Sequence, residues 1–184
     1  GGTDVLVDLQ RPVVQSSLYN LAEVGSDVSS LLTTFSGDQS DPPIWSEKER
    51  NNPSTLVSLH KLASLKQIEI LNDGRLQVGA LATARDIQRV ADVRMKWPGL
   101  AEGADAVGSP LVRARGTIGG NICNARPAAD MLVPAICLDA ELHLQSSAGV
   151  RTTKGEGFVT GPGRTTIQPG EILTRIIFPA PGQK

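Results

Sequence analysis

Residues 112–130 read VRARGTIGGNICNARPAAD, and this stretch decides how the rest of the chain is interpreted. At its centre, Gly119 and Gly120 remove two adjacent β-carbons, so the backbone can turn sharply and a ligand can lie against its N–H groups. Thr117 and Asn121 flank the pair with a hydroxyl and an amide. These residues predict an uncharged loop that can cradle a pyrophosphate; the alternative is an ordinary turn between a strand and a helix.

Two neighbouring features favour an anion as the ligand. Arg113 and Arg115 lie just before the glycine pair and would offset the negative charge of a pyrophosphate. Residues 127–138 contain two prolines and an apolar run, which predict a helix or helical turns. The positive dipole end of such a helix would face the same anion.

A second glycine pair lies in GGTDVL at residues 1–6, and two such loops suit a long dinucleotide. The chain also carries TIGGNI at 117–122, ARPAAD at 125–130 and GPGRTTIQPGEILTRIIFP at 161–179. With these four motifs the sequence resembles the FAD-binding domain, or medium subunit, of molybdenum hydroxylases such as xanthine dehydrogenase and carbon monoxide dehydrogenase.

The resemblance implies an α+β fold of the p-cresol methylhydroxylase/vanillyl-alcohol oxidase (PCMH) type, with a mixed N-terminal lobe and an antiparallel-sheet lobe with helices. It covers roughly residues 1–10 and 55–179 and predicts one FAD-binding domain over residues 1–179. The resemblance also implies a strand-helix-strand unit before the first glycine loop, whereas this sequence begins inside that loop. Residues 11–53 are predicted to be a surface insertion, either a tolerated excursion or a contact to a partner subunit. Residues 180–184 would begin a linker to an absent C-terminal domain.

The same resemblance implies a FAD site built from both glycine loops. The residues that it places around the cofactor are Gly1, Gly2, Thr3, Asp4, Thr117, Gly119, Gly120, Asn121, Ile122, Asn124, Asp130 and Leu173. The two loops would line opposite sides of the pyrophosphate, with Ile122 and Asn124 near the flavin. Asp130 would hydrogen-bond the cofactor, or cap a helix as the alternative. Leu173 would pack on the isoalloxazine ring, although a core leucine would look the same. Arg126 departs from the family's usual Ser or Ala and adds a cation.

Local patterns along the chain predict hairpins separated by helices, which is an α+β order. The predicted helices are 16–32, 84–96 with a capping box formed by Thr83 and Asp86, 100–106, and the one within 127–138. The predicted strands are one within 55–65, the hairpin pairs 67–71 with 75–80 and 140–147 with 149–154, and a closing strand at 171–179. Residues 155–169 are expected to be a glycine-rich loop.

Composition excludes several other classes of protein. A formal net charge of −1 over 184 residues provides no basic field for nucleic acid, and no apolar run reaches the ~20 residues that span a bilayer. Cys123 and Cys137 are too few for a metal cluster and, with no signal peptide, indicate a reducing cytoplasm. His60 and His143 are expected to be ordinary structural histidines. GxSxG and GxxxxGK[ST] motifs are absent from the sequence.

The resemblance therefore implies an electron-transfer module that binds FAD and has no catalytic residue set of its own. Electrons from a molybdenum cofactor would reach FAD through 2Fe-2S centres and leave to NAD, a quinone or oxygen. The expected partners are an iron-sulfur subunit and a molybdopterin-binding large subunit, which would carry those other cofactors. The alternative is a flavin-free scaffold subunit that keeps the same fold.

Overall fold

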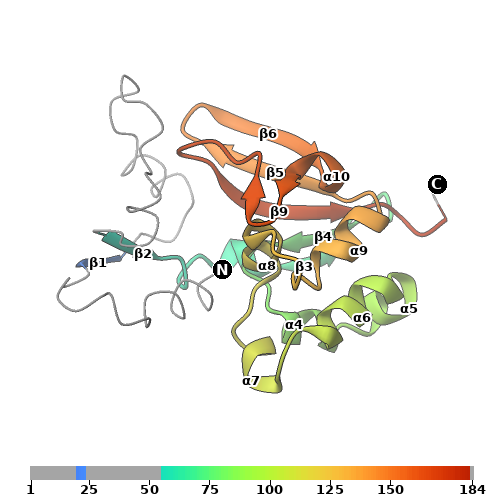
Figure 1. The fold of residues 1–184 in the computed structure, drawn as a ribbon. Helices are drawn as coiled ribbons and strands as arrows, with labels where there is room; N and C mark the ends of the chain where they lie inside the picture. Colours follow the sequence, from blue (N-terminus) through green and yellow to red (C-terminus); the bar gives the residue numbers. More distant parts are fainter. Residues whose placement is uncertain (1–19, 24–54, 183–184) are drawn as a thin grey trace.

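The structure of the chain is a computed structural model, which describes residues 20–23 and 55–182 (Figure 1). The first glycine loop, Gly1–Asp4, lies outside the described residues, as does all of the predicted insertion 11–53 except β1 (Asn20–Glu23). Strand β1 pairs in parallel with β2 (Thr55–Ser58). The prediction of a helix over residues 16–32 is therefore wrong at β1, where backbone pairing with β2 decides the local structure. The assignment of 11–53 as an insertion stays a prediction.

A five-stranded antiparallel sheet forms the body of the described region, in the order β3-β4-β9-β5-β6 (Figure 1). Its strands are β3 (Ile68–Ile70), β4 (Leu76–Gly79), β5 (Glu141–Ser146), β6 (Gly149–Lys154) and β9 (Ile172–Phe178). Both predicted hairpins and the closing strand are confirmed. The closing strand lies at the centre of the sheet, between β4 and β5, so the last part of the chain joins the two hairpins into one sheet.

The sheet buries one face, as its alternating sequence predicts. In β5, Leu142 and Leu144 are fully buried, whereas His143 and Gln145 point to the opposite, partly exposed face. The β3–β4 hairpin turns at Gly74, whose φ of +83° is in the left-handed region that glycine adopts without strain. The predicted NDG turn is confirmed by this conformation.

The helices are η1 (Ala63–Lys66), α4 (Ala84–Arg89), α5 (Ala91–Lys96), α6 (Pro98–Ala106), α7 (Pro110–Arg113), α8 (Ile118–Asn124), α9 (Leu132–Cys137) and α10 (Gly155–Phe158). Residues of α4, α5, α6, α8, α9 and α10 share one aliphatic core with the buried face of the sheet. The buried residue of η1, Leu65, belongs to a separate small cluster, and α7 has no buried residue. In Figure 1, α8 and α9 lie between the sheet and the group α4–α6, consistent with the packing of α8 on β9 and of α9 on α6. Within the described residues, no helix is long and apolar enough to cross a membrane.

The single helix predicted over residues 84–96 is in fact two helices, α4 and α5, separated at Val90. Val90 has an extended backbone conformation (φ −84°, ψ 106°). In an uninterrupted helix of 3.6 residues per turn, Val93 would face away from Ala84. Because of the break, Ala84 and Val93 are both fully buried in the same core. The predicted capping box at Thr83 and Asp86, with both of its hydrogen bonds, is confirmed.

The prediction that residues 155–169 form a loop is also wrong. This segment contains α10 and a short antiparallel pair, β7 (Val159–Gly161) with β8 (Arg164–Thr165). Phe158, at the end of α10, is fully buried in the main core. Burial of this aromatic ring outweighs the loop preference of the neighbouring glycines.

Candidate cofactor site

The glycine pair of the TIGGNI motif lies in the first turn of helix α8, and the prediction that it forms a loop is wrong. Thr117 is the N-cap, and its side-chain oxygen accepts a hydrogen bond of 3.1 Å from the N–H of Gly120. A threonine cap satisfies a helical N–H that otherwise has no partner, which offsets the low helix propensity of two glycines.

The segment that follows β4 holds the start of α8. The N–H groups of Ile118 and Gly119 donate to the carbonyl oxygens of Ala82 and Ala80, each at 2.9 Å. The idea that these N–H groups are open to a ligand is therefore wrong for Ile118 and Gly119. A β-carbon on Gly119 would lie 2.7 Å from both the Cβ and the carbonyl oxygen of Ala80. Gly119 thus allows close packing of α8 on the end of β4.

Helix α8 has one buried face and one partly exposed polar face. Ile118 and Ile122 are fully buried in the main core. Thr117, Asn121 and Asn124 follow one another at helical spacing, which places their side chains on one side of the helix. All three are partly exposed, as is Gly120 between them, and this group of four is called the α8 polar face below.

Asp130 is held next to this face through its own peptide group. The Asn121 side-chain oxygen accepts a hydrogen bond of 3.0 Å from the N–H of Met131, which follows Asp130 directly. Met131, not Asp130, is the N-cap residue of α9, and no side chain caps that helix. The alternative that Asp130 acts as a helix cap is therefore wrong. Asp130 is partly exposed and lies within the segment that links α8 to α9.

Leu173 lies in the core, at the start of the central strand. It is 8% exposed and is paired in register with Leu144 of β5. Ile122 belongs to the same core cluster, so both residues support the site from inside the protein. The structure thus brings together the second-loop residues of the predicted site around α8, whereas Gly1–Asp4 lie outside the described region.

Arg113, which was expected to offset the charge of a pyrophosphate, instead binds the backbone at the end of α6. Its Nη1 donates to the carbonyl oxygens of Asp105, Val107 and Gly108 at 3.2, 3.1 and 2.7 Å. These carbonyls lie at the C-terminal end of a helix, where a cation is favourable. Arg115 is exposed.

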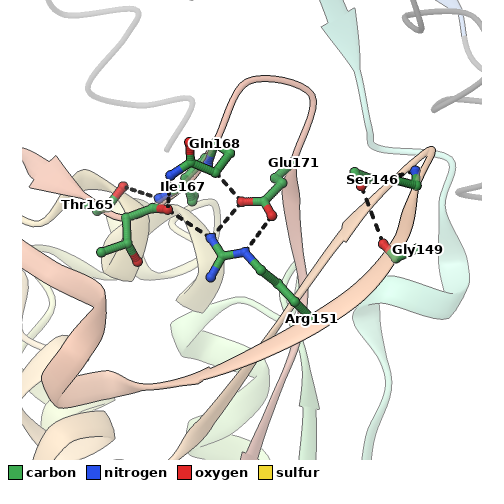
Figure 2. A network of polar contacts seen from close by, with 9 residues as sticks. Ser146, Gly149, Arg151, Thr165, Ile167, Gln168 and Glu171 are labelled. Atoms are coloured by element: carbon green, nitrogen blue, oxygen red, sulfur yellow. Dashed lines mark hydrogen bonds and ion pairs between the residues drawn. The ribbon is translucent and has the colours of Figure 1, made fainter. Parts of the chain in front are cut away.

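An ion pair that sequence reasoning missed fixes the segment before Leu173 (Figure 2). The Arg151 guanidinium on β6 donates to both carboxylate oxygens of Glu171 at 2.5 and 2.7 Å, and to the carbonyl of Thr166 at 2.8 Å. The Glu171 carboxylate also accepts from the N–H of Gln168 at 2.7 Å. The hydrogen bonds from Arg151 hold the pKa of Glu171 below its usual value. Arg151 and Glu171 are 20 positions apart, so no local sequence pattern indicates that they form a pair.

Cys123 and His143 are two further titratable groups whose pKa values are shifted by burial. Burial raises the pKa of the Cys123 thiol to about 12, so this thiol is not a nucleophile. Burial also lowers the pKa of His143, which keeps that imidazole neutral. Among the residues that the structure describes, no group of three or more His, Cys, Asp or Glu side chains could hold a metal ion.

With the geometry of α8 and its neighbours established, comparison with known proteins gives the family. The family described as "FAD binding domain in molybdopterin dehydrogenase" matches residues 7–181. The chain belongs to this family. The match runs through residues 11–53 and includes the whole described sheet with its helices.

Individual relatives agree with this assignment. The xanthine dehydrogenase FAD-binding subunit of Escherichia coli O157:H7 is 36% identical over 124 residues, which is 67% of this chain and 42% of the relative. The carbon monoxide dehydrogenase medium chain of Afipia carboxidovorans is 30% identical over 176 residues, 95% of this chain and 59% of the relative. The crystal structure of quinoline 2-oxidoreductase from Pseudomonas putida 86 aligns with a TM-score of 0.79 at 27% identity, over 92% of this chain and 61% of that chain. The chain thus spans about half the length of its relatives.

The side chains around α8 fit the chemistry of FAD. Thr117 carries a hydroxyl that accepts from Gly120 and can donate its own proton to a phosphate oxygen. The amide of Asn124 lies on the same face of the helix and is likewise partly exposed. The Asp130 carboxylate suits the hydroxyl groups of a ribose or ribityl chain as an acceptor. An uncharged helix face with one neighbouring carboxylate matches a ligand that combines phosphates with sugar hydroxyls.

Proposed function

We propose that this chain is the FAD-binding electron-transfer part of a molybdopterin-dependent dehydrogenase. The observation that carries the proposal is the α8 polar face, because a family-specific motif there presents hydroxyl and amide groups on one side of a helix whose other side is fixed in the core. In this proposal the residues around α8 bind and orient the cofactor. The chain itself supplies no group that acts on an organic substrate.

Each predicted site residue except Gly119, which packs α8 on the end of β4, has a role at the cofactor in this proposal. Thr117 and Asn124 bind the cofactor directly from the α8 polar face, and Gly120 lets it approach the helix between them. Asn121 orients the peptide beside Asp130, whose carboxylate accepts hydrogen bonds from cofactor hydroxyls. Ile122 and Leu173 form the apolar support beneath the site. The first glycine loop, Gly1–Asp4, binds the opposite side of the pyrophosphate.

Bound FAD would supply the redox chemistry, since a flavin accepts and releases electrons singly or in pairs. The relatives named above are a FAD-binding subunit and a medium chain, and this wording describes parts of larger assemblies. We therefore propose an iron-sulfur subunit and a molybdopterin-binding large subunit as partners. We further propose that the assembly is cytoplasmic and that its FAD passes electrons to NAD, a quinone or oxygen.

The first test compares two threonines that each cap a helix, Thr83 in a capping box and Thr117 without one, and that pair with each other in an isolated β-bridge. Thr83 and Thr117 have similar extended conformations, and each accepts a hydrogen bond from an N–H three residues later. Both Thr83→Val and Thr117→Val remove a cap and should lower the free energy of unfolding by about 0.5–2 kcal/mol. Only Thr117→Val should also weaken FAD binding, by more than about tenfold or 1.4 kcal/mol. Affinity is measured by titrating the full-length protein with FAD and following the flavin absorbance.

The outcomes of this test separate FAD binding from the alternative function. Equal FAD affinity in the two folded variants would remove Thr117 from the site. Wild-type protein that shows no flavin bands and takes up no added FAD would instead favour the flavin-free scaffold. We expect purified full-length wild type and Thr83→Val to show the visible absorbance bands of a flavin. Thr117→Val alone should lose these bands.

A further inference from the structure

Helix α6 approaches the α8–α9 link more closely than any side chain there would allow. A β-carbon on Gly103 would lie 2.9 Å from the carbonyl oxygen of Asp130 and 2.8 Å from Cγ of Pro134. Pro134 lies in α9, and because its ring is closed onto the backbone, the Cγ atom cannot rotate away from a new side chain. Gly99, in the first turn of the same helix, has nothing within 4 Å of its hypothetical β-carbon. Close contact is thus a property of Gly103 and not of α6 as a whole.

The carbonyl that Gly103 faces and the N–H that Asn121 binds belong to one peptide group. The N–H of Met131 donates to the Asn121 side chain on α8 at 3.0 Å, while the carbonyl of Asp130 faces α6. Pro134 has no N–H, so this carbonyl receives no helical hydrogen bond from the residue four positions later. The orientation of the peptide is therefore set by α8 on one side and by the close approach of α6 on the other.

We propose that Gly103 is a positioning residue for the cofactor, acting through Asp130. The inference rests on the proposed function, in which the Asp130 carboxylate binds cofactor hydroxyls. A peptide plane that is fixed at both polar ends fixes the direction in which the Asp130 side chain leaves the backbone. A methyl group at position 103 pushes the carbonyl away, rotates that plane and moves the carboxylate away from the α8 polar face. A small shift at a positioning group is sufficient to reduce binding.

The test compares Gly103→Ala with Gly99→Ala in the full-length protein. Both substitutions replace a helical glycine with the best helix former, which stabilises an open position by roughly 0.5–1 kcal/mol. Gly99→Ala should bind FAD as tightly as the wild type. Gly103→Ala should bind FAD at least about tenfold more weakly. A folded Gly103→Ala protein with wild-type FAD affinity would overturn the proposal, provided that the wild type itself binds FAD.

A double-mutant cycle with Asp130→Asn distinguishes positioning from a general loss of structure. If Gly103 acts through the Asp130 carboxylate, Gly103→Ala should cost little further affinity once that carboxylate has been replaced. A full additional tenfold loss in the Asp130→Asn background would show that Gly103 acts by another route. If the wild type does not bind FAD, the proposed function is wrong. If the wild type binds FAD and Gly103→Ala binds it equally well, only the role of Gly103 is wrong.

A second variant covers the case in which Gly103→Ala does not fold. Pro134→Ala removes the ring carbon at 2.8 Å but leaves the Asp130 carbonyl at 2.9 Å from a β-carbon at position 103. It also gives position 134 an N–H that can donate to the Asp130 carbonyl, so the comparison is made between two variants that both carry this N–H. The double variant Gly103→Ala/Pro134→Ala should therefore fold better than Gly103→Ala and still bind FAD more weakly than Pro134→Ala alone. Equal affinity of the double variant and Pro134→Ala would overturn the proposal.

Discussion

Gly119 and Gly120 show how two adjacent glycines divide packing and binding between them. Sequence reasoning gave both glycines of TIGGNI the same task, a bare backbone facing a ligand. In the structure the two differ, because Gly119 faces Ala80 and is buried, while Gly120 lies between Thr117 and Asn121 on the partly exposed side. The first glycine brings the helix against the sheet, and the second leaves space on the α8 polar face.

This difference predicts a stability effect at Gly119. In Gly119→Ala the new methyl group would meet the Cβ and carbonyl oxygen of Ala80 at 2.7 Å, and such overpacking costs about 1–3 kcal/mol. Gly157→Ala in α10 is the matched control, since its β-carbon would have only a side-chain oxygen nearby, at 3.8 Å. Urea unfolding of the two variants measures the difference. Wild-type stability of Gly119→Ala would mean that the packing at Ala80 does not require glycine.

At the scale of elements, predictions succeeded where the deciding residues lie close together in the sequence and failed where they lie far apart. The β3–β4 and β5–β6 hairpins were predictable because turn residues and alternating apolar positions lie within one short segment. The break at Val90 and the burial of Phe158 were not, because each depends on a core contributed by elements far away in the sequence. The Arg151–Glu171 pair is of this second kind, since it joins β6 to the segment before β9.

The Arg151–Glu171 pair predicts how stability depends on pH. Its hydrogen bonds lower the pKa of Glu171 from 4.5 in the folded state, so the stabilisation is complete above pH 4.5 and is lost as the pH falls through the folded-state pKa. Glu171→Gln should cost about 1–3 kcal/mol at pH 7, because it removes charged hydrogen bonds from a side chain that is 10% exposed. The deficit relative to wild type should shrink as the pH is lowered below 4.5.

A surface ion pair provides the control for this prediction. Arg94 and Asp105 also form a bridge, at 3.1 Å, but their side chains are 54% and 42% exposed. Exposed pairs contribute about 0–1 kcal/mol, so Asp105→Asn should have a smaller effect at pH 7. Thermal unfolding followed between pH 3 and 8 compares the two variants. An effect of Glu171→Gln no larger than that of Asp105→Asn would show that the pair does not hold β9 in place.

For the whole molecule, the sequence was sufficient to predict the family and the α+β order, but not the arrangement around the site. Short motifs such as TIGGNI were sufficient to predict the family, which the match over residues 7–181 confirms. They do not show that Arg113 binds three carbonyls at the end of α6, or that Gly103 faces the peptide of Asp130. Those relations depend on how helices pack in space, which no local pattern encodes.

The last prediction is that this polypeptide cannot oxidise an organic substrate without partners. A 2Fe-2S centre takes four thiolates, whereas the chain has two cysteines, and burial raises the pKa of the Cys123 thiol to about 12. In the proposed function, electrons would therefore reach bound FAD from cofactors held by other subunits or domains. Purified native assembly should reduce its flavin when given substrate, and the separated chain loaded with FAD should not. Oxidation of a purine or an aldehyde by the separated chain would contradict this prediction, whereas flavin reduction that returns when the iron-sulfur and molybdenum components are added back would support it.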